Sequence, residues 1–504
     1  MNPEPASLDS SKGKNFFCQL LIPFVNIHNS ELIRTLVAFI GLCLIMCSYY
    51  IMKPVRSALI LGDLGPDYLP YVYLSQGIFT LFATFIYNNL SIRFSKLVLV
   101  RLTYFTILAI FLGFWGALSY LENFKNIQAI SRVEKSRSVD KKSGSRGNKQ
   151  QAIDGEHKKG LTKAEIIEAQ AEKLVLSTFI TKVLSFTFNI FVSTYILFVM
   201  AIFWSTNHDI FNTEEACRLF GMILLGAQVG QFFGGKITVL FAAELGTLNL
   251  ILISASILFL AFICAEILHS NYNPVKKSSP PKKETPKKSK FSEMFEDFKT
   301  VFFERHFSWI AILVIFASMS NTILDFQYNN LVSQTFSSNK DQITEHIGNF
   351  WKYNAQLNIL ILLFLSSRVV RYLGPAIILL FLPFLHLISN LKLALGSMLA
   401  GVMPFAIATM TFNYTLYNMG KEVLYVPVEQ NLRYRMKAFI GAFCFRFGDG
   451  LAAVSMIFFT KFFAGRAYTY SRILFLVILV FWIPVILKAN SSFKTFKTEA
   501  ETEI

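Results

Sequence analysis

The chain has 504 residues, of which 53% are apolar and only 16% are charged, and its mean hydropathy is +0.47. An ordinary soluble domain has roughly 25% charged residues, so this composition excludes a typical water-soluble globular protein. The formal net charge is +16. Because much of this charge lies in hydrophilic segments and at the ends of apolar runs, it indicates membrane topology and not binding to nucleic acid.

The first 30 residues carry Pro, Ser and Asp before a short apolar stretch. They contain no basic-then-apolar pattern with a small-residue cleavage site, so we expect no cleaved signal peptide. An apolar stretch at 16–25 is too short to cross a bilayer and is better suited to its interface. We therefore interpret 1–30 as an N-terminal cytoplasmic segment.

About twelve apolar runs follow, each close to the roughly 20 residues that cross ~30 Å of hydrocarbon. No alternating pattern typical of barrel strands is present, so we predict an all-α polytopic membrane protein. The predicted spans lie near 31–53, 68–87, 97–120, 180–204, 217–240, 247–268, 307–330, 350–367, 373–389, 392–416, 438–460 and 470–488.

Hydrophilic segments divide these spans into two halves of six. The N-terminal half, 31–268, contains an insert at 121–177, which begins with a mixture typical of disorder and continues as a helix that extends the fourth span. A lysine- and proline-rich cytoplasmic linker at 269–306 separates it from the C-terminal half at 307–488, and 489–504 is a tail. Two halves around a basic linker are typical of alternating-access transporters with internal repeats.

Three glycines of the fifth span, Gly226, Gly230 and Gly234, recur at every fourth residue. This spacing puts them on one helix face and allows a neighbouring helix to approach closely. The pattern predicts tight packing, and it fits a static contact and a moving one equally well.

Charges inside apolar spans are costly in a bilayer and are usually paired or functional. Five such residues are Lys53, Arg56, Asp325, Arg446 and Asp449. We expect Pro54 to interrupt the helix between Lys53 and Arg56, and we favour a role in the transport pathway over simple snorkelling for these two. Arg446 and Asp449 are one helical turn apart, so an internal ion pair and a substrate site both fit their spacing.

A guanidinium group has a fixed fork of donors that matches paired phosphate oxygens. We therefore predict that Lys53, Arg56 and Arg446 bind an anionic substrate. Two further groups complete the candidate site. The candidates for coupling or ion pairing are Asp325, Lys421, Glu422 and Asp449, and those for a pocket around a base are Tyr49, Asn413 and Tyr417.

Motifs for enzymatic or metal chemistry are missing from the sequence. It contains no glycine-rich phosphate loop ending in Lys-Ser/Thr, no H-E-x-x-H and no G-x-S-x-G. The six cysteines form no C-x-x-C pair, and the seven histidines are scattered without metal-ligand spacing. We therefore expect a protein that is not an enzyme and has neither a cofactor nor a metal site.

Three segments in chain order, 53–59, 203–221 and 421–428 followed by Lys437-Ala438, contain recognisable motifs. The first includes Lys-Pro-Val-Arg, the second is a polar turn after the fourth span, and the third reads Lys-Glu-Val-Leu-Tyr-Val-Pro-Val. They resemble the basic first-span motif, the loop between spans four and five, and the K-E-x-x-Y-I-P-L segment of the bacterial and plastid ATP/ADP translocase family. This resemblance implies a major-facilitator-like fold and nucleotide exchange.

The resemblance has three departures. Arg56 stands where translocases usually have a lysine, Ser57 replaces the acid that commonly follows, and Asp449 replaces the lysine of a G-K-S-G-G-like run. The acidic residue of the family's fourth span has no clear match at 193–202.

The sequence thus predicts a secondary transporter, with ATP/ADP or another nucleotide as its substrate. Two alternatives remain open: a major-facilitator-type carrier of another organic anion or solute, and a non-transporting membrane protein that holds a partner through its insert. The resemblance implies a bacterial inner membrane. We expect both termini to be cytoplasmic, because basic residues gather at the span ends that would face inward.

Overall fold

The computed structural model describes residues 28–143, 163–271 and 296–502, apart from positions 297, 302, 397, 464 and 465. The apolar stretch at 16–25 and most of the linker at 269–306 lie outside these ranges. The regular elements within them are helices, which agrees with the predicted all-α class.

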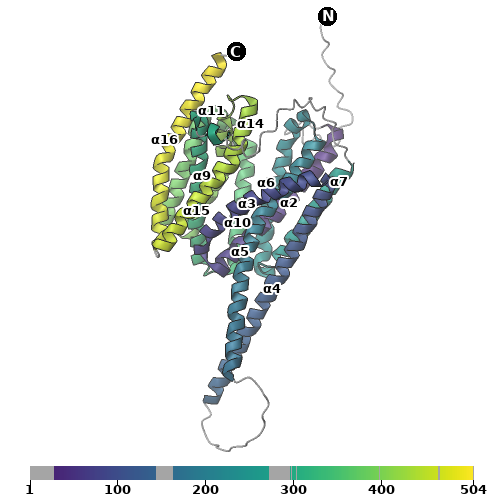
Figure 1. The fold of residues 1–504 in the computed structure, drawn as a ribbon, viewed down its shortest axis with the longest axis vertical. Helices are drawn as coiled ribbons and strands as arrows, with labels where there is room; N and C mark the ends of the chain where they lie inside the picture. Colours follow the sequence, from purple (N-terminus) through teal and green to yellow (C-terminus); the bar gives the residue numbers. More distant parts are fainter. Residues whose placement is uncertain are drawn as a thin grey trace, which may run out of the picture.

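Six long helices form the N-terminal half (Figure 1). Its elements are α2 (Asn29–Leu59), the π-helical η1 (Ile60–Leu64), η2 (Pro66–Tyr68), α3 (Leu69–Arg93), α4 (Lys96–Ser143), α5 (Lys163–Ile210), α6 (Thr213–Leu245) and α7 (Leu250–Asn271). Local sequence explains a boundary such as the start of α6, where Asn212 and Glu215 form a capping box.

The C-terminal half also has six membrane segments, two of which are interrupted. Its elements are α9 (Arg305–Thr335), α10 (Lys340–Leu360), η3 (Ile361–Leu365), α11 (Ser366–Ala394), α12 (Leu399–Phe412), η4 (Asn413–Tyr417), α13 (Asn418–Val423), α14 (Gln430–Phe439), η5 (Ile440–Cys444), α15 (Phe445–Phe462) and α16 (Ala467–Thr502). α12, η4 and α13 form one crossing, and α14, η5 and α15 form another. α11 bends at Gly374, which has a φ of 71°.

Eleven segments of the described chain are long and apolar enough to cross a membrane. The twelfth position in the bundle belongs to α10, which packs against α6 and α2. The predicted eighth span, 350–367, lies about ten residues too far along the chain, because α10 runs from Lys340 to Leu360. Asparagines on α10 face α6 and not lipid, as shown by the bonds of Asn354 and Asn358, so the helix has a weak hydropathy peak.

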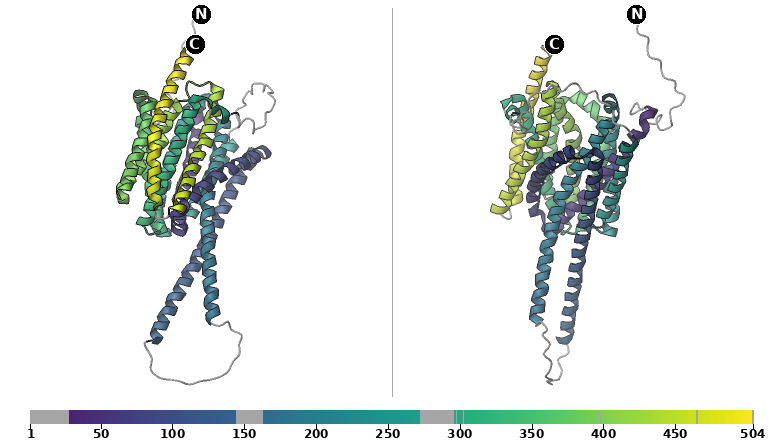
Figure 2. Two further views of the ribbon diagram at one scale, coloured as in Figure 1. Left: turned by 60° about the vertical axis from the view of Figure 1, so that its left-hand side comes forward. Right: turned by 45° about the vertical axis from the view of Figure 1, so that its right-hand side comes forward.

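The insert is a long helical extension of two spans. α4 continues to Ser143 and α5 begins at Lys163, and both helices project well beyond the rest of the bundle (Figures 1 and 2). The predicted helix that extends the fourth span is therefore present, as the first part of α5. The expectation of disorder from residue 121 onward was wrong as far as Ser143, because the α4 helix does not end where its apolar run ends.

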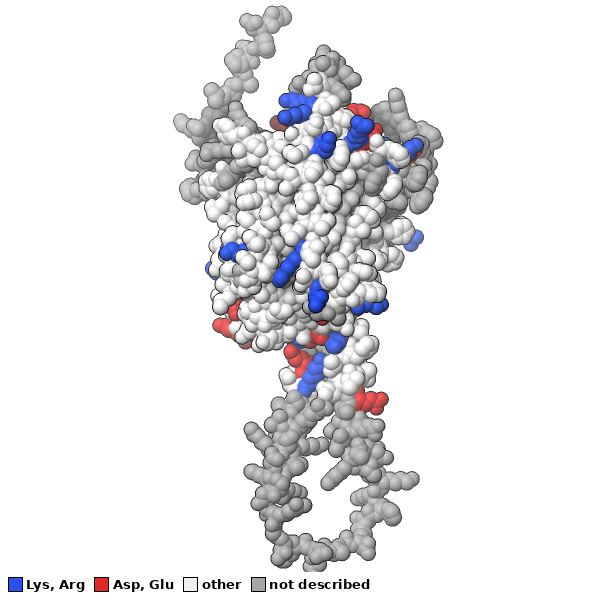
Figure 3. Space-filling model, turned by 90° about the vertical axis from the view of Figure 1, so that its left-hand side faces the viewer, with Lys and Arg blue, Asp and Glu red and all other residues white. Residues whose placement is uncertain are grey.

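Each half has its own apolar core, and the outer surface is suited to lipid. One cluster of buried side chains belongs to α2 and α4–α7, and the other is centred on α9–α16 and includes the end of α2, η1 and the start of α3. Large apolar side chains such as Phe85, Phe259 and Phe481 are exposed. Figure 3 shows a broad uncharged band on one face, with most charged side chains toward its two ends.

Candidate functional site

A cavity of about 440 Å³ lies between the halves, lined by residues of α2, α3, α5, α9, α10, α12, α13, α15 and η4. It collects nine of the ten predicted site residues: Tyr49, Lys53, Arg56, Asp325, Asn413, Tyr417, Lys421, Arg446 and Asp449. Arg56 and Arg446, which come from opposite halves, therefore face one shared space. Glu422 does not line it and instead pairs with Lys437 at 2.6 Å, where both side chains are nearly half exposed.

The cations of the N-terminal wall are held by neutral groups. The Arg56 guanidinium donates to the hydroxyl of Ser193 on α5, and the Arg56 carbonyl accepts from Asn189 Nδ2 at 3.2 Å. The Lys53 ammonium lies 3.3 Å from the centre of the Trp351 ring. In the described ranges, neither cation has a carboxylate within ion-pair distance.

The C-terminal wall pairs its arginine with an acid. Arg446 Nη1 is 3.3 Å from Asp449 Oδ2, while Asp449 Oδ1 accepts from the hydroxyls of Ser318 and Thr322 on α9. This network fixes α15 against α9 through buried polar contacts. It also leaves the Arg446 charge largely neutralised in this conformation.

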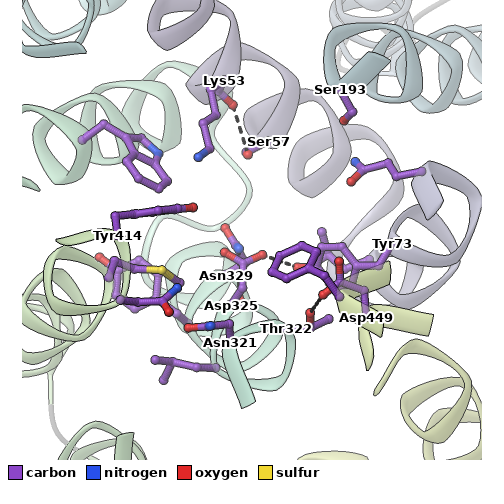
Figure 4. A pocket seen from close by; sticks show the side chains of 18 of the residues that line it. Lys53, Ser57, Tyr73, Ser193, Asn321, Thr322, Asp325, Asn329, Tyr414 and Asp449 are labelled. Atoms are coloured by element: carbon purple, nitrogen blue, oxygen red, sulfur yellow. Dashed lines mark hydrogen bonds between the residues drawn. The ribbon is translucent and has the colours of Figure 1, made fainter. Parts of the chain in front are cut away.

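Asp325 is the second carboxylate of the cavity, and it connects the two halves. It lies on α9 and accepts from the phenol of Tyr73, which belongs to α3. Figure 4 shows Asp325 and Asn329 on one side of the cavity and Lys53 entering from the opposite side. At the other end of the cavity, Lys421 donates to Asn418 Oδ1 at 3.0 Å.

The cavity has an excess of positive charge. Its lining contains four cations, Lys53, Arg56, Lys421 and Arg446, and two carboxylates, Asp325 and Asp449, which leaves a formal excess of two. Uncompensated charge is costly at membrane depth, where it usually marks a substrate or ion pathway. The arrangement therefore suits an anion with several charged oxygens.

Several cavity residues were not identified from the sequence. They are chiefly the amides and hydroxyls Gln76, Asn189, Asn321, Thr322 and Asn329, together with the aromatic residues Tyr73 and Trp351. A periodic pattern was available for the α9 residues, since Ser318, Asn321 or Thr322, Asp325 and Asn329 recur every three or four residues within an apolar run. Trp351 had no such pattern, because aromatic residues are common throughout the chain.

The halves are joined at the end of the bundle from which the insert projects. Lys340 Nζ at the start of α10 is 2.8 Å from Asp63 Oδ1 in η1, and Asp63 also accepts from Ser185 of α5 at 2.7 Å. Asp341 accepts from both the amide and the hydroxyl of Thr247. These bonds hold the two halves together at the insert end of the bundle.

At the opposite end of the bundle, where α2 begins and α16 ends, the contacts are of another kind. The ion pairs of the described residues there each stay within one half, as in Arg34–Glu215 and Lys437–Glu422. The cavity reaches toward this end through Asn418 and Lys421. Within the described ranges, the ion pair that joins the two halves, Lys340–Asp63, lies at the insert end.

Sequence comparison with known proteins finds a matching family and named relatives. Residues 161–493 match the family model described as TLC ATP/ADP transporter. ADP,ATP carrier protein 1 of Rickettsia conorii is 25% identical over 336 residues, which cover 60% of this chain and 67% of the relative. The chloroplastic ADP,ATP carrier protein 1 of Arabidopsis thaliana is 22% identical over 342 residues, covering 60% and 53%.

Solved structures show the same fold at low identity. The nucleoside transporter NupG superposes with a TM-score of 0.56 at 14% identity, covering 93% of this chain and 100% of NupG. The POT family transporter PepTSo gives 0.51 at 11% identity, covering 94% and 99%. The predicted arrangement of two six-helix halves is thus confirmed, and the protein is a multi-pass membrane protein. From the family match over most of its length, this chain belongs to the TLC ATP/ADP transporter family.

Proposed function

We propose that this protein exchanges nucleotides, with ATP and ADP as its substrates, across a membrane by alternating access. The main support is the cavity between the halves, whose lining has a formal excess of two positive charges. Arg56 and Arg446 face this cavity from opposite halves, so a phosphate chain between them would contact both. The relatives named ADP,ATP carrier protein support the choice of substrate.

In this mechanism the substrate enters from the end at which α2 begins. Its phosphates bind Lys53 and Arg56, whose present partners are neutral groups. They then compete with Asp449 for Arg446, which draws α15 toward α2. As the halves close around the substrate, the Lys340–Asp63 ion pair at the insert end breaks and the cavity opens there.

The proposed orientation puts both ends of the chain in the cytoplasm of a bacterial cell. The beginning of α2 and the end of α16 lie at the same end of the bundle (Figure 1). Basic residues such as Arg93, Lys96 and Lys488 near that end agree with the positive-inside rule. The helical extensions of α4 and α5 would then face outward.

The experiment is uptake of labelled ATP into proteoliposomes that contain ADP. We expect uptake to require internal ADP, and Arg56→Ala to lower kcat/KM about 10- to 100-fold, because hydrogen bonds to charged groups contribute ~1.5–3 kcal/mol. Arg56→Lys keeps the charge but loses the donor fork, so its activity should lie between those of Arg56→Ala and the unmodified protein. The matched control is Arg93→Ala, an exposed arginine at the end of α3, which should leave uptake unchanged.

A folded protein that neither imports ATP nor exchanges it for ADP would overturn the proposal. Competition by a panel of other organic anions then tests the second candidate, which the Arg446–Asp449 pair favours, because that pair leaves fewer free cations for a highly charged substrate. Activity that survives Arg56→Ala and Arg446→Ala but is lost on deletion of 121–177 would indicate a partner-binding protein.

A further inference from the structure

Among the described residues that line the cavity, Lys53 is the cation that lies against an aromatic ring of the other half. Its ammonium lies 3.3 Å from the centre of the Trp351 ring, and the ring of Tyr50 is 5.3 Å away. Lys53 belongs to α2 and Trp351 to α10, and both residues line the cavity. The face of a ring attracts a cation through its quadrupole.

This attraction is weaker than the bonds that Arg446 and Lys421 make in the structure. It is also weaker than the bond that Lys53 would make with a phosphate. Arg446 has a carboxylate and Lys421 has an amide oxygen, whereas the cavity-facing contacts of Lys53 are rings. A charge-assisted hydrogen bond to a phosphate oxygen is stronger than a cation–ring contact. A phosphate in the cavity would therefore draw Lys53 off Trp351 and uncover the ring face.

The Trp351 ring is held rigidly enough to serve as a platform. The rings of Phe350 and Tyr50 pack beside it at centroid distances of 5.1 and 5.4 Å. The backbone carbonyl of Trp351 accepts a hydrogen bond from the side-chain amide of Gln231 of α6 at 3.1 Å. A nucleobase stacks on such a face without demanding hydrogen bonds of its own. The flat aromatic part of the substrate would then take the place of the ammonium.

We infer that Trp351 is the base-stacking residue of this transporter, and that Lys53 and the base occupy the same ring face in turn. This inference rests on the proposed function and deepens it, because it defines the substrate class as nucleotides with a stacking base and excludes simple polyphosphates as good substrates. Purine nucleotides should bind better than pyrimidine nucleotides, since the larger ring system covers more of the indole.

The test compares inhibition of labelled ATP uptake by ADP, CDP and inorganic tripolyphosphate. In the unmodified protein we expect ADP to inhibit about 5- to 100-fold more strongly than tripolyphosphate, in line with the usual strength of base stacking. Trp351→Leu removes the aromatic face but keeps apolar bulk, and it should reduce this ratio to less than about threefold. Trp351→Phe should retain most of the preference for ADP over tripolyphosphate.

Two controls keep the outcomes distinct. Trp204→Phe changes a tryptophan that does not line the cavity, so it should leave the ratio unchanged. If Trp351→Leu fails to fold, intrinsic tryptophan fluorescence provides the test. ADP should quench the fluorescence of the unmodified protein and of Trp204→Phe, but it should quench that of Trp351→Phe much less. An unchanged ratio in Trp351→Leu, or an equal quench in Trp351→Phe, overturns the inference while ATP exchange stands. Failure of the proposed function would instead appear as absence of ATP uptake in the unmodified protein.

Discussion

Contacts inside the N-terminal half differ in kind from contacts between the halves. Inside the half, the three glycines of α6 bring its backbone against the carbonyls of Phe39 and Cys43 and of a third α2 residue one turn further on. Ion pairs such as Arg218–Glu31, at 2.9 Å, add to this contact. The α2–α6 contact thus combines close backbone packing with charge.

Between the halves, the side-chain hydrogen bonds that join α6 to α10 are made by neutral amides. Gln231 donates to Asn354 at 2.8 Å, and Asn358 donates to Gln228 at 3.0 Å. A hydrogen bond of this kind contributes only ~0.5–1.5 kcal/mol, so it can break and form again at little cost. The α2–α6 contact thus relies on close backbone packing and ion pairs, whereas the side-chain hydrogen bonds between α6 and α10 are neutral, which suits the separation of the halves that the proposed alternating access requires.

The largest effect is expected inside the half, at Gly230. A Cβ added there would lie 2.1 Å from the Cys43 carbonyl oxygen, and a backbone atom cannot move aside as a side chain can. We expect Gly230→Ala to cost about 3 kcal/mol, at the upper end for overpacking, and to lower the thermal unfolding midpoint in detergent. Gly221→Ala is the control, because a Cβ there meets nothing within 4 Å. Equal midpoints for the two variants would contradict the close packing of α2 and α6.

A smaller effect is expected at Gly235, which faces the other half. Its added Cβ would lie 2.8 Å from both the Gly348 carbonyl oxygen and the Lys352 amide of α10. Because the halves can shift apart where α2 and α6 cannot, Gly235→Ala should slow exchange about fivefold while lowering the unfolding midpoint less than Gly230→Ala does. Parallel measurement of exchange rate and midpoint checks this. A midpoint loss as large as that of Gly230→Ala would show that the boundary is as fixed as the interior of a half.

The smallest effect is expected for the Lys340–Asp63 ion pair. Asp63→Asn should favour opening at the insert end by up to about fivefold, since a partly exposed pair contributes at most ~1 kcal/mol. The readout is labelling of a cysteine at Ser57 by an impermeant thiol reagent added on the insert side, with the native cysteines replaced. The charge-swapped double variant Asp63→Lys with Lys340→Asp should return labelling toward its original level. Labelling that ignores both changes would rule out a closing role for this pair.

The candidate site was largely predictable because charge inside an apolar span is rare. Lys53, Arg56, Asp325, Arg446 and Asp449 were each conspicuous in the sequence, and the structure places all five on one cavity. Glu422 was also selected, but an acid at a span end is ordinary, and it pairs with Lys437 outside the cavity. Trp351 could not be selected, since its position depends on how α10 faces α2.

The glycines of α6 also show what could be predicted from the sequence and what could not. The four-residue repeat on α6 predicted a close helix contact but could not distinguish a static contact from a moving one. The structure identifies the partners, because Gly226, Gly230 and Gly234 face α2 of the same half, whereas Gly235 faces α10 of the other. Neighbouring positions on one helix thus serve two interfaces.

The sequence by itself determined the membrane class, the approximate spans and the set of buried charges, because hydrocarbon penalises polar groups strongly enough to leave a one-dimensional pattern. It misplaced the polar helix α10, whose asparagines are satisfied by α6 and not by its own span. Only the tertiary structure decided which charges share a cavity, which of them are paired, and where an ion pair joins the halves. These features depend on the rotation of each helix and on contacts between residues more than a hundred positions apart, such as Gln231 and Asn354, and local sequence does not specify them.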